Sequence, residues 1–179
     1  MALDPLILTL ALDDTAQGYF ETLRQAQFPP ARNVLAAHLT LFHHLPAEYH
    51  AALDADLATV CAAQGPMPIT VSGLLFLGKG VAFSLDSPTL DAARGDLARR
   101  WWPWLGEQDR RRFRAHVTVQ NKVDPAQAHA LHEELQASFA PFEVAGVGLH
   151  LWRYLGGPWE SLAMYPFAGA TRGGTGEQR

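Results

Sequence analysis

The chain has 179 residues, 48% of them hydrophobic and 18% charged, so it can bury the core of one ordinary domain and is not disordered throughout. Its net charge of −4 argues against broad, salt-dependent adhesion to nucleic acid, so any phosphate recognition requires a local cluster of side chains. The single cysteine, Cys61, excludes an internal disulfide and a cysteine-based zinc cage.

The first half of the chain alternates between apolar runs and segments that begin with helix-capping residues. The opening run is too short to span a membrane and lacks the basic start of a signal peptide, so it predicts a buried strand in a soluble, cytoplasmic protein. Asp13 offers an N-cap to the first helix, and Pro46 opens the second. The predicted order is strand, helix, strand, helix, strand, over residues 5–12, 13–27, 35–45, 46–65 and 67–77.

The same order repeats after the turn Gly78-Lys79-Gly80. Ser87-Pro88 and Asp124-Pro125 are pairs of an N-cap and a proline, which are typical of a helix start. The predicted elements are a strand, a helix, a strand, a helix and two strands, over residues 81–85, 87–102, 112–123, 124–139, 142–154 and 160–167.

This internal repeat predicts an α+β fold in which a strand-helix-strand-helix-strand unit is duplicated about a pseudo-two-fold axis and a central groove. We expect one bilobal domain over residues 1–168, with lobes over about 1–78 and 79–168. The sequence leaves open whether the lobes exchange strands. Residues 169–179 lack apolar periodicity, so they are predicted to form a disordered tail.

Each repeat carries the tripeptide His-x-Thr in an alternating apolar run, as His38-Leu39-Thr40 and as His116-Val117-Thr118. Positions i and i+2 of a strand share a face, so each copy places an imidazole beside a hydroxyl. The pseudo-symmetry would bring the two histidines face to face across the groove. Two histidines can serve as acid and base near neutral pH, and two hydroxyls can hold a phosphate, so the pair predicts a phosphoesterase.

Strand alternation extends the predicted site to further side chains on the same faces: Phe42, His44, Arg114, Gln120 and Lys122. Phe42 is predicted to form a wall for a base or a sugar, and Arg114 or Lys122 to add positive charge near the phosphate. Lys79, in the turn between the halves, is a further candidate for a phosphate contact.

Aromatic and basic clusters elsewhere allow both a functional and a structural interpretation. Tryptophans of two segments, 101–104 and 152–159, could form a platform for stacking bases, although large aromatic side chains usually belong to the core. Arg110 to Arg112, with Arg114, resemble a nucleic-acid patch, although a short basic loop in an acidic protein is usually only solvated.

On its two motifs and its order of elements, the sequence resembles the two-histidine (2H) phosphoesterase superfamily, which includes 2′-5′ RNA ligase-like proteins and cyclic phosphodiesterases. The matching segments are His38-Leu39-Thr40-Leu41 and His116-Val117-Thr118-Val119, and the resemblance extends over roughly residues 6–167. It implies a bilobal fold whose water-filled groove holds both motifs. It also implies metal-independent cleavage of a 2′,3′-cyclic phosphate or a related phosphodiester.

We therefore expect His38 and His116 to be the catalytic pair, and Thr40 and Thr118 to hold the phosphate, without a cofactor or a metal. The expected partner is a small cyclic nucleotide or an RNA end that bears a cyclic phosphate, and the expected state is a monomer. The sequence does not decide which histidine is the base or which ribose oxygen leaves.

Three alternatives stay open. The same chemistry in reverse would join RNA ends, and a binding module would hold a nucleotide without turning it over. A metal-dependent hydrolase could use His38, His43, His44 and His50. Against the last alternative, neighbouring strand residues face opposite ways, and no acidic or cysteine ligands with suitable spacing accompany these histidines.

Overall fold

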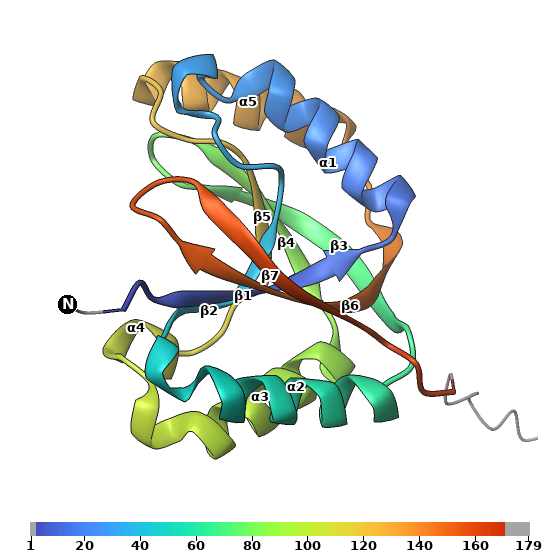
Figure 1. Ribbon diagram of the computed structural model, residues 1–179. Coiled ribbons are helices and arrows are strands. Elements are labelled where there is room, and N and C mark those ends of the chain that lie inside the picture. The colour runs from blue at the N-terminus through green and yellow to red at the C-terminus, as the bar shows by residue number, and fades with distance from the viewer. Residues whose placement is uncertain (1–2, 171–179) are drawn as a thin grey trace, which may run out of the picture.

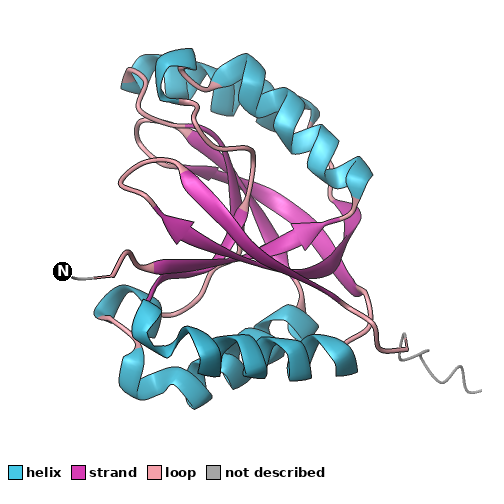
Figure 2. Cartoon of the chain, viewed as in Figure 1, coloured by secondary structure: helices cyan, strands magenta, loops and turns pink. Residues whose placement is uncertain are grey.

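The computed structural model describes residues 3–170, which form one antiparallel sheet between two layers of helices (Figures 1 and 2). The strands are β1 (Leu6–Leu12), β2 (Leu39–Leu45), β3 (Met67–Phe76), β4 (Val81–Asp86), β5 (His116–Gln120), β6 (Phe142–Tyr154) and β7 (Trp159–Pro166). The helices are α1 (Asp14–Gln27), α2 (His50–Ala63), α3 (Pro88–Trp101), the short α4 (Glu107–Arg110) and α5 (Pro125–Ser138). Short 3₁₀ turns occupy Pro30–Arg32, Ala47–Tyr49 and Trp102–Trp104. The predicted α+β class and the predicted order of the main elements are confirmed.

Both motif strands are shorter than predicted. The ladder of β2 begins only at Leu39, because the backbone before it bonds to side chains of α1 instead of to a strand. Gln17 donates from Nε2 to the carbonyl of Ala37 (2.8 Å), and the amide of Ala37 donates to the carboxylate of Glu21 (2.6 Å). β5 likewise covers only His116–Gln120 of the predicted segment 112–123.

The strand order of the sheet is β2-β1-β6-β3-β4-β5, and β7 pairs with β6 beside this path. If β1, β2 and β3 are exchanged with their counterparts β4, β5 and β6, the same order is obtained in reverse. β3 pairs with β4 and β6 pairs with β1, so each sequence half lends one strand to the other half of the sheet. The two motif strands stand at opposite ends of the order.

The helices also cross between the halves. α1 and α5 lie on one side of the sheet, whereas α2 and α3 lie on the other (Figure 1). Phe20 of α1 packs edge-to-face on Phe83 of β4, with ring centroids 5.3 Å apart, and α1 also contacts β5. Trp101 of α3 packs on Phe42 of β2 (5.2 Å). Each unit therefore supplies the helix that covers the motif strand of the other unit.

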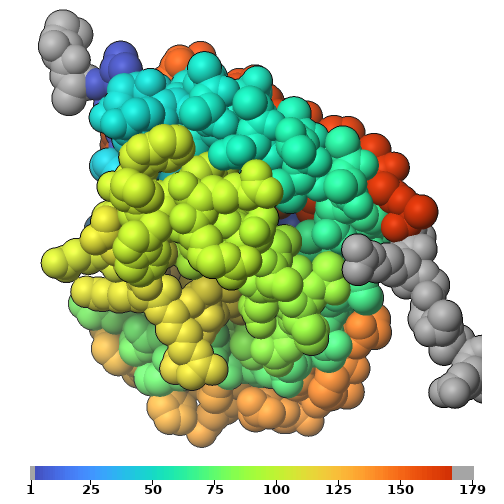
Figure 3. All heavy atoms as spheres, turned by 90° about the horizontal axis from the view of Figure 1, so that it is seen from below, coloured from blue at the N-terminus to red at the C-terminus, as the bar shows by residue number. Residues whose placement is uncertain are grey.

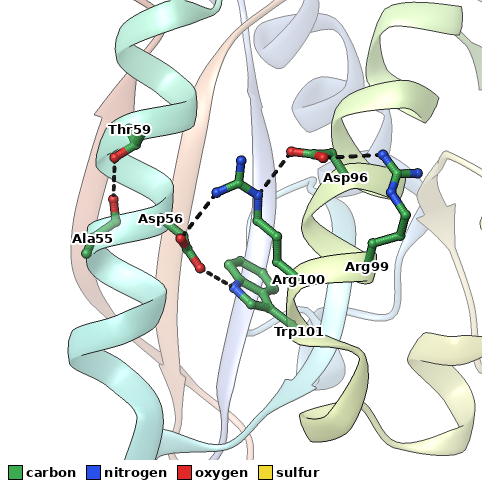
Figure 4. Close-up of polar contacts among 7 residues, drawn as sticks. All are labelled: Ala55, Asp56, Thr59, Asp96, Arg99, Arg100 and Trp101. Carbon is green, nitrogen blue, oxygen red and sulfur yellow. Dashed lines mark hydrogen bonds and ion pairs between the residues drawn. The ribbon is translucent and has the colours of Figure 1, made fainter.

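Figure 3 views the layer of α2 and α3 from outside, and the inner side of this layer is apolar. Leu53, Leu57 and Cys61 are buried at a spacing of four residues, which places them on one face of α2. Figure 4 shows the link between the helices: Asp56 accepts a hydrogen bond from the indole of buried Trp101 (2.8 Å) and pairs with Arg100 (3.4 Å). The indole bond satisfies a buried donor, whereas exposed ion pairs of this kind contribute little to stability.

Capping side chains fix the starts of α1 and α3 as predicted. Asp13 accepts from the amide of Ala16 (2.9 Å), and Ser87 accepts from the amide of Leu90 (3.2 Å). Asp124 precedes α5 but forms no side-chain cap. Of the predicted tail, only the first two residues, 169 and 170, belong to the described residues, and 171–179 lie outside them.

Candidate functional site

The two motif histidines are anchored in the same way. His38 Nδ1 lies 2.7 Å from the carbonyl oxygen of Ala36, and His116 Nδ1 lies 2.9 Å from that of Arg114. A carbonyl oxygen only accepts, so Nδ1 carries the hydrogen in both rings. Each ring therefore offers Nε2 for chemistry, as an acceptor when the ring is neutral and as a donor when it is protonated.

The surroundings of His38 favour its neutral form. Desolvation by the surrounding protein is the largest influence and lowers the pKa of His38; the positive charges of Arg24, His116 and His43 lower it further, and the carbonyl of Ala36 opposes them. The effect of His116 means that its imidazole lies close enough to His38 for its charge to disfavour protonation of His38.

The motif threonines lie in the ladders of the outer strands. Thr40 is paired with Thr9 of β1, and Thr118 with Ala82 of β4. Both threonine side chains are half-buried, so their hydroxyls combine a fixed place in the sheet with access to solvent. Each stands two residues after its histidine: His116 and Thr118 share a face of β5, and His38 lies directly before the start of β2.

Alternation fails directly after each threonine, which corrects two predictions. Leu41 and Val119 are extra residues in the ladders, because Leu8 is paired with Phe42 and Val81 with Gln120. Each bulge turns the next side chain away from the motif face. Phe42 is fully buried and covered by the guanidinium of Arg94, 4.4 Å from its ring centre, so it is not a wall of the groove. Gln120 is fully buried as well, and its amide has no hydrogen-bond partner within the described residues.

The predicted basic contacts lie outside the regular part of β5. Arg114 precedes the strand with an exposed side chain, and its carbonyl anchors His116. Lys122 follows the strand in a turn with φ 62°, so strand alternation does not reach it. Lys79 lies near this turn, since its carbonyl accepts from the amide of Val123 (3.1 Å). Contact of these three residues with substrate stays a prediction.

Two buried arginines, which sequence reasoning missed, connect the helices to the motif strands. Arg24 of α1 is 4% exposed and donates to the carbonyl of Thr118 (2.9 Å) and to that of Leu35 (3.0 Å). Arg94 of α3 is 8% exposed and donates to the carbonyl of Leu41 (3.4 Å). The signal in the sequence was an arginine on the first helix of each unit, within an otherwise apolar face.

Buried Asp109 of α4 joins the loop before the second motif to the strand of the first. Its carboxylate accepts from the backbone amides of His43 (2.8 Å) and His44 (2.9 Å), and it lies 3.2 Å from His43 Nδ1. Burial alone would raise the pKa of Asp109, but these hydrogen bonds outweigh it and lower the pKa.

Two further expectations concern metals and membranes. Across residues 3–170, no three or more His, Cys, Asp or Glu side chains are grouped closely enough to hold a metal ion, and this includes the set His38, His43, His44 and His50. Within the same part of the chain, no helix has the length and hydropathy that crossing a bilayer requires.

The tryptophans of the two predicted platforms lie in different environments. Trp101 is a core residue, and Trp104 stacks on Tyr49 with ring centroids 4.3 Å apart. Trp102 is half exposed, but it lies on the 3₁₀ turn after α3. Trp159 alone contacts a motif histidine, with its ring 4.7 Å from that of His38, and Trp152 lies beside it.

Comparisons with known proteins identify a family and similar folds. The family model described as "2′-5′ RNA ligase superfamily" matches residues 12–158. TT0787 of Thermus thermophilus has a similar fold, with a TM-score of 0.64 and 17% identity over 93% of this chain and 100% of that one. E. coli LigT, complexed with NADP+, has a TM-score of 0.58 and 17% identity over 93% and 99%. LigT complexed with 3′-AMP gives 0.56 and 16% over 92% and 98%. No curated protein matches the chain.

Proposed function

The chain belongs to the 2′-5′ RNA ligase superfamily, and on that premise we propose that it is a metal-independent phosphoesterase that hydrolyses a 2′,3′-cyclic phosphate or a related phosphodiester. Family membership supports a phosphoesterase-type function. The observation that carries the finer proposal is the shared anchoring of His38 and His116, which leaves Nε2 of each ring available. The proposed substrate is a small cyclic nucleotide or an RNA end with a cyclic phosphate.

The proposed reaction needs one proton acceptor and one proton donor. Nε2 of the neutral histidine takes a proton from water, and the water oxygen forms a bond to phosphorus. The bond from phosphorus to one ribose oxygen breaks, and Nε2–H of the other, protonated histidine gives its proton to that oxygen. Attack is roughly in line with the departing oxygen, so the acid and the base must stand on opposite sides of phosphorus.

The threonines and one buried cation supply the remaining groups. The hydroxyls of Thr40 and Thr118 would donate to the non-bridging phosphate oxygens, where negative charge increases during attack. Arg24 lies close enough to the site to lower the pKa of His38, so its charge also favours an anion there. Arg114 and Lys122 are proposed to add charge at the rim of the groove.

The coupled histidines predict a bell-shaped pH dependence of kcat/KM. Activity requires one neutral and one protonated ring, and both limbs belong to the pair rather than to single residues. Because the surroundings of His38 lower its pKa, the acidic limb of the pair is expected below the ordinary histidine value of 6.5.

The structural relatives are consistent with a nucleotide ligand. LigT has been crystallised with NADP+ and with 3′-AMP, both of which are nucleotides. We propose that the groove of this chain also accepts a nucleotide, with the phosphate between the two motifs. The outcome of hydrolysis would then be a nucleoside 2′- or 3′-monophosphate.

The test is turnover of nucleoside 2′,3′-cyclic phosphates in EDTA by the wild type, His38→Ala and His116→Ala. His129→Ala is the matched control, because His129 is exposed and lies on α5, outside both motif strands. Each motif variant should lose about 100-fold or more in kcat/KM, and the control should keep its activity.

Three outcomes would contradict this proposal or redirect it. Loss of wild-type activity in EDTA would favour a metal-dependent hydrolase. A wild type that binds nucleotides without turning them over would favour a binding module. Formation of a 2′-5′ linkage after addition of an RNA with a 5′-hydroxyl would show that the reverse reaction occurs.

A further inference from the structure

A cavity of about 590 Å³ opens beside His38. Its walls come from β1, the start of α1, the loop over residues 34–38, and the strands β6 and β7. The residues that matter below are Thr9, Gln17, His38, Trp152, Trp159 and Met164. The volume lies within the range of small-molecule sites.

The aromatic walls of this cavity are held in place. Trp152 donates from its indole to Oγ1 of Thr9 (2.9 Å), and its ring stacks on His150 with centroids 3.7 Å apart. His150 is fixed in turn by Ser161 (2.7 Å from Nε2 to Oγ). A fixed indole ring of this kind forms an apolar surface that needs little further ordering when a ligand binds.

Trp159 connects the cavity to the proposed catalytic pair. Its ring centroid lies 4.7 Å from that of His38 and 6.0 Å from that of Trp152. A ligand whose phosphate lies between the motifs would therefore meet indole rings next to His38. Gln17 offers a polar contact to a ligand. Its Nε2 donates to the carbonyl of Ala37, and its Oε1 can accept a hydrogen bond from the ligand.

The residues that line the cavity differ from those at the corresponding positions of the other half. Gly148 of β6 is paired with Ala11, and Gly73 of β3 is paired with Ser84, so the two glycines hold corresponding places. Two and four residues further on, β6 presents His150 and Trp152, whereas the other half has Leu75 and Leu77. β7, which carries Trp159, has no counterpart in the strand order. A ligand can therefore find an aromatic wall on the His38 side that the other half does not offer.

We propose that this cavity is the subsite for the nucleobase of the substrate, so that the nucleoside always lies on the His38 side of the phosphate. The inference rests on the proposed function, since it places the phosphate between the motifs. A planar base stacks on indole rings, and such stacking tolerates different bases because every base has a π-face. The one-sided wall thus decides how an asymmetric substrate lies in a site whose catalytic motifs are duplicated.

The test compares binding of adenosine 3′-monophosphate with binding of inorganic phosphate, both by calorimetry. Trp159→Leu should weaken binding of the nucleotide by about tenfold or more, as expected for the loss of one stacking contact, and leave phosphate binding unchanged. Trp102→Leu is the matched control, because Trp102 is exposed and lies outside the cavity. Met164→Trp, at a cavity position that is 45% exposed, should fill the space and weaken the nucleotide alone without risk to the core.

Equal affinities of the wild type for nucleotide and phosphate, or equal losses of both ligands in Trp159→Leu, would overturn the subsite. Failure of the proposed function is a separate result. In that case the wild type would not turn over any cyclic phosphate, but the selective loss of nucleotide binding in Trp159→Leu and Met164→Trp would still support a base subsite. If cyclic phosphates are turned over and these variants bind the nucleotide normally, only the subsite is wrong.

Discussion

Arg24 of α1 donates a hydrogen bond of 2.9 Å from Nη1 to the carbonyl oxygen of Thr118, which lies 94 residues further along the chain. This bond ties the first helix of one unit to the motif strand of the other. Arg94 makes the corresponding bond to Leu41, just after the first motif. The two motifs are therefore positioned by side chains that cross between the units, so the site depends on both halves of the chain being in place.

Arg24→Met should lower the free energy of unfolding by about 2–4 kcal/mol, because the carbonyls of Leu35 and Thr118 lose a buried, charged donor. Urea denaturation measures the change. Arg99→Met is the control, since Arg99 is exposed and pairs only with Asp96. A change in Arg24→Met no larger than in the control would contradict the role of Arg24 in joining the units.

The hydrogen atom of each neutral motif imidazole is expected on Nδ1. The carbonyls of Ala36 and Arg114 accept from that nitrogen, so Nε2 should be the unprotonated nitrogen in both rings. Correlation of ¹⁵N and ring-proton signals above pH 8 distinguishes the two tautomers directly. Signals of Nε2–H tautomers for His38 and His116 would show that the anchoring does not exist in solution.

The pKa of His38 should rise when the neighbouring imidazole is removed. Desolvation and the charges of Arg24, His116 and His43 lower this pKa, so the neutral side chain in His116→Gln takes away one repulsion. An NMR titration of the His38 ring measures the shift, and His44→Gln serves as the control. An unchanged titration in His116→Gln would mean that the two rings do not face each other.

Asp109 should stabilise the fold above pH 4 and lose this effect in acid. Its pKa is lowered from the ordinary value of 3.8, so the native state favours the charged form, and the stabilisation disappears as the pH falls through the lowered pKa. Asp109→Asn should cost about 2 kcal/mol at pH 7, because an amide NH₂ would face a backbone amide of β2. Urea titrations at pH 7 and pH 3 measure the difference between the two proteins. A difference that stayed the same at both values would be contrary to this account.

The periodicity of apolar residues and the positions of helix-capping and turn residues predict most of the fold from the sequence. The apolar runs and caps give the order of the elements and the duplicated unit, because both depend on local preferences. The exchange of β3 and β6 between the halves could not be predicted, since it depends on which strands pair. The bulges at Leu41 and Val119 could not be predicted for the same reason, because they are defined only by the register with β1 and β4.

The candidate site was predictable only where two residues stand two apart on a strand. That spacing was enough to single out His38 with Thr40 and His116 with Thr118, whose roles in catalysis and phosphate binding stay predictions. The predicted position of Phe42 was wrong because the extra residue Leu41 turns the Phe42 side chain to the opposite face of β2. Arg24 and Arg94 were missed because a buried arginine on a helix is recognised only through the carbonyls that it reaches.

The central claim is that one motif histidine is the acid and the other is the base. It is tested most directly with a 2′,3′-cyclic phosphate in which sulfur replaces the departing ribose oxygen, assayed with His38→Ala and His116→Ala. A thiolate is a far better leaving group than an alkoxide and needs no proton, so the variant that lacks the acid should regain most of its lost activity. The variant that lacks the base should stay inactive. Recovery in both variants, or in neither, would contradict the division of roles.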